Sequence, residues 1–189
     1  MKNNRQNTTI PDSKTIKALE RVVNQAMSNG EATEAYLCTL RLPRQFADNQ
    51  HEANDIYKKI QSDFCKNVYR STGTTPRYIT VKTDNAANPE YALCLFTKHG
   101  AGLGANTEDY AEKGREIANT KCSKEGWGNG KLDLTELFRD APRFKIAHDP
   151  IQITQDNKAS VVEQLQRHLQ GQSHSTQAHQ RTLFVSKCP

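Results

Sequence analysis

Two strand-like segments separated by a short turn constrain the fold of this chain most. The segments RYITVKT (Arg77–Thr83) and YALCLFT (Tyr91–Thr97) are rich in β-branched and aromatic residues. The linker between them contains DNAANP, which is made mostly of turn-forming residues, so the pair is predicted to form a β-hairpin. A hairpin makes its two strands antiparallel, and its apolar face must be covered by other elements.

Helical and strand-like segments alternate on both sides of this hairpin. In chain order we predict a helix from Ser13 to Gly30, a strand from Tyr36 to Pro43, a helix over residues 53–68, the hairpin, a helix from Glu108 to Lys121, a short helix at LTELF, a strand from Pro142 to Pro150 and a helix from Asn157 to Gln170. This order predicts an α+β fold with a mainly antiparallel sheet of about four or five strands flanked by helices. Residues 1–12 are predicted to be a flexible N-terminal segment, and residues 13–189 to form a single α+β domain.

Composition excludes several classes of protein. Only 35% of the 189 residues are hydrophobic, and no apolar run approaches the roughly 20 residues of a membrane helix. The polar N-terminus has no apolar signal region, so we expect a cytoplasmic protein without a membrane partner. The five cysteines are odd in number and form no CxxC pair, which favours reduced thiols over a disulfide framework or a zinc site. We predict no cofactor and no metal.

Basic residues recur on the predicted strands. Strand alternation places Thr39 and Arg41 on one side of their strand, and Thr80 and Lys82 on one side of theirs. The opposite sides are apolar: Cys38, Leu40, Leu42, Ile79 and Val81. We therefore expect one apolar sheet face and one basic, polar face. Such a face could follow a phosphate backbone, and the alternative is an ordinary solvated sheet face.

Three histidines lie in the glutamine-rich region near the C-terminus. His168, His174 and His179 have no supporting cysteine or carboxylate pattern, so we expect solvated surface histidines and not a metal site.

Four short segments resemble the YagK/YfjJ family of phage-replication-initiator-like proteins, which are similar to rolling-circle initiators of the HUH endonuclease class. LCTLRLP (Leu37–Pro43) resembles the family's arginine-containing first strand, and RYITVKT resembles its second strand. PEYALCLF (Pro89–Phe96) resembles its third strand, which normally reads Pro-His-Tyr-His, and LFVSK (Leu183–Lys187) resembles its Tyr-x-x-Lys segment. The resemblance implies an initiator-like arrangement of strands.

The resemblance also implies which catalytic groups are missing. A HUH enzyme holds a divalent metal with two histidines and attacks DNA with a tyrosine, and a lysine lies nearby. The histidine positions here contain Glu90 and Ala92, the acidic position contains Thr83, and the tyrosine position contains Phe184. Lys187 is retained. No catalytic residue is therefore predicted, because both the metal ligands and the nucleophile are replaced.

These observations favour a non-catalytic, replication-initiator-like binding protein of a mobile element such as a phage, satellite or plasmid. It would be a regulator or inhibitor whose partner is DNA, single-stranded or as a hairpin, or else a replication or host protein. The candidate DNA contacts are Arg41, Arg77, Lys82, Lys98 and Lys187. Two alternatives remain open: an active metal-dependent single-strand nickase with displaced ligands, and a pure protein–protein inhibitor of a host, phage or conjugation component.

Overall fold

A computed structural model gives the structure of the protein and describes residues 13–28, 33–83, 87–100, 107–129, 133–147, 149–170 and 183–186. The expectations for residues 1–12, His174, His179 and Lys187 lie outside the described residues.

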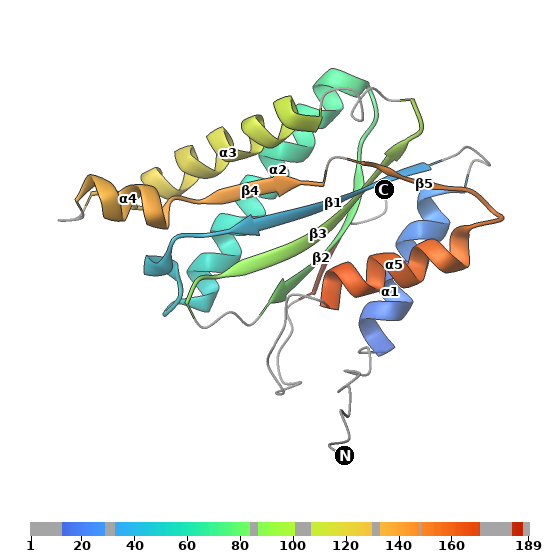
Figure 1. The fold of residues 1–189 in the computed structure, drawn as a ribbon, viewed down its shortest axis with the longest axis horizontal. Coiled ribbons are helices and arrows are strands. Elements are labelled where there is room, and N and C mark those ends of the chain that lie inside the picture. Colours follow the sequence, from blue (N-terminus) through green and yellow to red (C-terminus); the bar gives the residue numbers. More distant parts are fainter. Residues whose placement is uncertain are drawn as a thin grey trace, which may run out of the picture.

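Helices and strands alternate along the chain, as Figure 1 shows. The helices are α1 (Ser13–Ala26), the 3-10 helix η1 (Arg44–Phe46), α2 (Gln50–Thr72), α3 (Thr107–Lys124), α4 (Leu134–Asp140) and α5 (Lys158–Gln170). The strands are β1 (Thr33–Arg41), β2 (Arg77–Thr83), β3 (Glu90–Lys98), β4 (Arg143–Ile146), β5 (Ile151–Ile153) and β6 (Leu183–Val185). The predicted α+β class, with a mainly antiparallel sheet flanked by helices, is confirmed, and β2 and β3 form the predicted hairpin.

The six strands form one sheet in the order β4-β1-β3-β2-β6, and every pairing is antiparallel. β5 also pairs with β1, beside the first residues of that strand. The segments β1, α2, β2, β3, α3 and β4 make a β-α-β-β-α-β unit, into which α4 is inserted before β4. α1 precedes this unit, and β5, α5 and β6 follow it.

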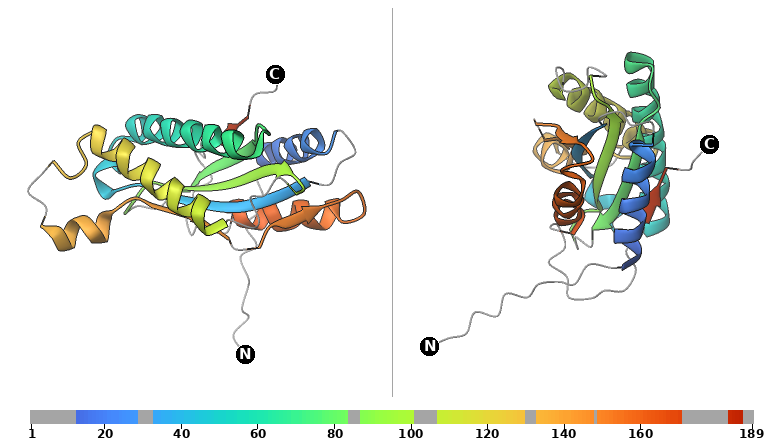
Figure 2. Two further views of the ribbon diagram at one scale, coloured as in Figure 1. Left: turned by 90° about the horizontal axis from the view of Figure 1, so that it is seen from above. Right: turned by 90° about the vertical axis from the view of Figure 1, so that its right-hand side faces the viewer.

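Helices cover both faces of the sheet. One buried cluster joins α2 and α3 to the side chains of Tyr36, Leu40 and Leu93 on the sheet. The second joins α1 and α5 to Ile79, Cys94 and other side chains on the opposite face. In the right-hand view of Figure 2 the sheet lies between these two pairs of helices. Both faces are therefore apolar where helices pack against them.

The prediction of one apolar and one basic sheet face is wrong, and the strand register gives the reason. Thr39 lies opposite Ala92, and Ala92 lies opposite Val81. Side chains directly opposite each other share a sheet face. Thr39 and Arg41 therefore lie on the α1–α5 face with Val81, whereas Lys82 and Thr80 lie on the α2–α3 face with Tyr91 and Leu93.

The helices α1 and α5 do not extend along the whole sheet. Figures 1 and 2 place them over the end of the sheet next to β5, whereas α4 lies at the opposite end. At this end of the α1–α5 face the side chains of Arg143 and Lys145 are exposed. Within the described ranges, no helix is both long enough and apolar enough to cross a membrane.

Candidate nucleic-acid interface

The residues that the sequence resemblance aligns with the catalytic groups of a HUH enzyme do not share one site. Ala92 is buried in the α1–α5 cluster, and Glu90 lies on the same side of β3. Phe184 lies against the α2–α3 cluster, where its ring centroid is 4.9 Å from that of Tyr57. The backbone of Thr83 pairs with Glu90 at the end of the hairpin. Phe184 and Ala92 are therefore separated by the sheet itself.

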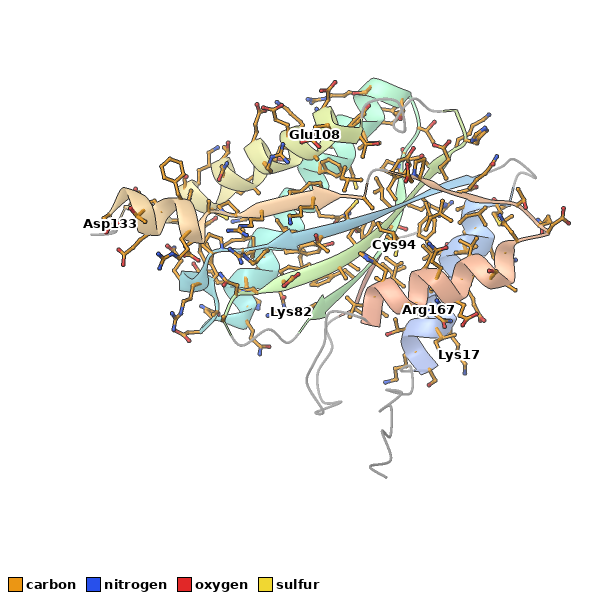
Figure 3. The ribbon with its side chains drawn as sticks, in the orientation of Figure 1. Lys17, Lys82, Cys94, Glu108, Asp133 and Arg167 are labelled. Carbon is orange, nitrogen blue, oxygen red and sulfur yellow. The ribbon has the colours of Figure 1, made fainter. Side chains whose placement is uncertain are left out.

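The four candidate DNA contacts within the described residues are also dispersed. Arg41 ends β1, whereas Lys82 lies on the other sheet face, only 8% exposed, with its ammonium 5.9 Å from the Tyr91 ring centroid. Figure 3 labels Lys82 near the end of β2. Arg77 and Lys98 lie at the opposite end of the strands and line one cavity of about 250 Å³. They do not form one continuous surface with Arg41.

A basic patch that the sequence did not delimit lies where β1 and β4 pair. Arg41 lies directly opposite Arg143, and Thr39 lies directly opposite Lys145. Arg143 and Lys145 are exposed, and the residues that alternate with them, Phe144 and Ile146, are buried on the α2–α3 face. Arg41, Arg143 and Lys145 thus share the α1–α5 face, and we call them the β1–β4 basic patch.

The electrostatics of this patch are unbalanced. Like charges directly opposite each other in a sheet destabilise it, and Arg41 and Arg143 form such a pair. Glu90 lies opposite Arg41 on β3 and balances one of the three positive charges. Neither Arg143 nor Lys145 forms a salt bridge within the described part of the chain. The patch therefore carries excess positive charge that an anion could neutralise.

The side chain of Arg41 is held in place by a hydrogen bond, but not all of its donors have a partner within the described ranges. Its terminal Nη2 donates a hydrogen bond to the Arg139 carbonyl oxygen at 3.2 Å. Its Nε is buried and has no hydrogen-bond partner among the described residues. The nearby Asp140 carboxylate accepts hydrogen bonds from the backbone amide of Arg44 and from Asn88. The Arg41 guanidinium is thus fixed at the end of β1, and its Nε faces the protein and not solvent.

A second polar cluster lies at the other end of β1. The Glu34 carboxylate, which is 8% exposed, accepts a hydrogen bond from Tyr36 at 2.6 Å and pairs with His99 Nδ1 at 2.8 Å. Burial and the neighbouring carboxylate raise the pKa of Tyr36 above its ordinary range. The three residues hold the start of β1 to the end of β3. Sequence reasoning missed this cluster, because only the β1–β3 register brings residues 34 and 99 together.

The groove beside β6 is the larger of two cavities that Arg77 lines. It has a volume of about 690 Å³ and lies between α2 and the edge of β2, with Tyr69, Tyr78 and Cys65 in its wall. Burial raises the pKa of Cys65 to about 11, so this thiol stays protonated and unreactive at neutral pH.

His168 lies against the sheet, so the expectation of a solvated surface histidine is wrong for this residue. Its Nε2 is 3.2 Å from the Cys38 carbonyl oxygen, to which it donates when protonated at that nitrogen. Burial lowers the pKa of His168, and the hydrogen bond to Cys38 opposes that effect. Across the described ranges, no three His, Cys, Asp or Glu side chains gather closely enough to hold a metal ion.

We expect the free energy of unfolding to decrease as the pH falls below about 6.5, where histidine in the unfolded chain becomes protonated. The folded pKa of His168 is lowered, so the unfolded state binds more protons in the window below 6.5 and stability is lost there. Urea unfolding at a series of pH values measures this dependence. His168→Gln should flatten the slope, and the exposed His51→Gln control should not; equal slopes for both variants would contradict the assignment.

Comparisons with known proteins identify no relative of this chain. No family model matches the chain, and no curated protein or solved structure matches it significantly. The fold defines the class of protein, an α+β sandwich built on a β-α-β-β-α-β unit, and the functional inferences below depend on the site.

Proposed function

We propose that this protein binds nucleic acid without cutting it, through the β1–β4 basic patch. In this proposal it is a replication-initiator-like regulator or inhibitor of a mobile element. The observation that carries nucleic-acid binding is the placement of Arg41, Arg143 and Lys145 on one exposed part of a sheet face. The connection to a mobile element depends on the four segments that resemble initiator-like proteins.

The spacing of the patch suits a row of phosphates. Adjacent strands lie about 4.8 Å apart, and side chains on one face repeat about every 6.8 Å along a strand. The three cations therefore lie within about one Debye length of one another at physiological salt, so their fields add. Exposed Arg44 and Arg139 flank the patch at the β1–α4 junction and increase the local positive potential.

Regulation of this kind requires no catalytic group. A protein that occupies an origin, or the strand released there, excludes an active initiator by mass action. Phe184, at the position where the resemblance places a tyrosine, has no nucleophilic oxygen and packs beside Tyr57. We therefore propose competition and not strand cleavage as the mode of action.

Titration of a labelled oligonucleotide across a range of salt concentrations tests the proposal. Three phosphate contacts predict that log affinity falls with log salt with a slope of about −2 for a single strand. Affinity that is absent, or that does not change with salt, would overturn nucleic-acid binding and favour a protein partner. A covalent protein–DNA adduct formed with Mn²⁺ would overturn the non-catalytic part and favour a nickase.

A further inference from the structure

Phe138 is the most exposed large apolar side chain in the described ranges, at 79%. It lies on α4, which begins with a capping box formed by Asp133 and Glu136. Figure 3 labels Asp133 at the outer end of α4. The neighbouring Leu137 is half-buried and points toward the turn after α3, where it lies near Gly128. The helix thus places one apolar side chain against the protein and leaves the next one in solvent.

Hydrogen bonds attach α4 to Arg41 of the β1–β4 basic patch and to Arg44 of η1. The carbonyl oxygen of Arg139, the residue after Phe138, accepts a hydrogen bond from Arg41. The carboxylate of Asp140 accepts the backbone amide of Arg44 at 2.8 Å and 3.0 Å. Phe138 therefore immediately precedes Arg139, the residue whose carbonyl oxygen binds Arg41 of the patch. The helix that carries the exposed ring is therefore joined directly to Arg41 of the patch.

The charge around Phe138 selects its partner. An exposed aromatic ring gains free energy when another apolar surface covers it. Arg139 follows Phe138 in the chain, and its carbonyl oxygen accepts a hydrogen bond from Arg41, so a partner that covers the ring and also reaches the patch must combine flat apolar faces with negative charge. Unpaired bases on a phosphate backbone have both properties, whereas a duplex keeps its bases stacked inside.

We propose that Phe138 stacks on an unpaired base, so that the preferred ligand of the β1–β4 basic patch is a single-stranded nucleic acid. This inference rests on the proposed function. The patch arginines and lysine hold the backbone, and the ring of Phe138 distinguishes single strands from duplexes.

The test compares Phe138→Ala and Phe138→Tyr with the wild type by fluorescence anisotropy. The probes are labelled DNA and RNA single strands of one sequence, the DNA duplex of that sequence, and a DNA strand with abasic positions. Phe138→Ala should weaken single-strand binding about tenfold with no change in the salt slope, because stacking on one base is lost. Phe138→Tyr should retain the affinity, and a side chain this exposed should not change the thermal midpoint when it is replaced.

Two further comparisons separate stacking from other roles of Phe138. The duplex should bind the wild type and Phe138→Ala equally. The abasic strand should bind the wild type as weakly as it binds Phe138→Ala. Unchanged single-strand affinity in Phe138→Ala, or an equal loss for single strand and duplex, would overturn the stacking proposal.

A third variant separates failure of this inference from failure of the proposed function. Arg143→Ala combined with Lys145→Ala should weaken single-strand and duplex binding alike and reduce the salt slope. If this variant loses affinity and Phe138→Ala does not, binding through the basic patch is supported and the stacking role of Phe138 is overturned. If no variant changes the affinity, both proposals fail.

Discussion

Gly114→Val is expected to reduce the free energy of unfolding by about 3 kcal/mol or more, which is the upper range for overpacking a core. Gly114 lies on α3 where this helix packs against β4. A Cβ atom at this position would overlap Cδ1 of Phe144 and lie 2.6 Å from its Cγ. The Phe144 ring is 2% exposed and packs against Phe64 with ring centroids 4.7 Å apart, so it has little space to move.

Denaturant unfolding followed by circular dichroism measures this effect. Asn119→Val is the matched control, because it introduces the same side chain at an exposed position of α3 and the two residues have similar helix propensities. Phe144→Leu replaces the ring with a smaller side chain and so leaves room for part of the added valine. Gly114→Val combined with Phe144→Leu should therefore reduce the free energy of unfolding by less than the sum of the two single changes. An unfolding free energy for Gly114→Val equal to that of Asn119→Val would mean that α3 does not pack closely on β4.

Reversing the two exposed charges of the β1–β4 basic patch is expected to weaken nucleic-acid binding about 100-fold at low salt, a free energy of about 2.7 kcal/mol. The variant is Arg143→Glu combined with Lys145→Glu. It removes two phosphate contacts and adds two repulsive charges at the same positions. The fold should persist, because Glu at position 143 would lie opposite Arg41 and replace a like-charged cross-strand pair with an opposite-charged pair.

The control for this variant reverses the same two residue types on the other face of the protein. Lys113→Glu combined with Arg115→Glu changes the net charge equally, and both residues take part only in surface ion pairs on α3. Anisotropy titrations should show a small loss for the control and the large loss for the patch variant, with similar thermal midpoints. Equal losses would indicate a general effect of net charge, and the β1–β4 basic patch would then not be the binding site.

Local sequence signals identified most elements of the fold. The turn residues between Arg77–Thr83 and Tyr91–Thr97 predicted the hairpin, and helical spacing predicted α1, α2, α3 and α5 within a few residues. The three-residue strands β5 and β6 were not predicted as strands, because a segment this short has no measurable alternation. α2 extends beyond its predicted range because Asn49 caps its start and Gly73, with φ 69°, ends it.

The candidate site was predicted only in part. Arg41 was singled out from the sequence, but its neighbours in the patch depend on pairing with β4, a strand about a hundred residues away. Lys82 was grouped with Arg41 because both alternate with apolar residues. The structure places them on opposite faces, since Thr39 is in register with Val81 through Ala92. The exposure of Phe138 was likewise not visible in the sequence, where it belongs to an apolar helical segment.

The sequence by itself determined the order of the helices and strands, the antiparallel hairpin and the alternation of side chains within each strand, because these depend on residues close together in the chain. Only the tertiary structure decided which sides of different strands share a face, that helices cover both faces, and that Arg41, Arg143 and Lys145 come together on one face. Strand register and helix packing are set by contacts between distant segments that bury apolar surface together. No local pattern specifies those contacts.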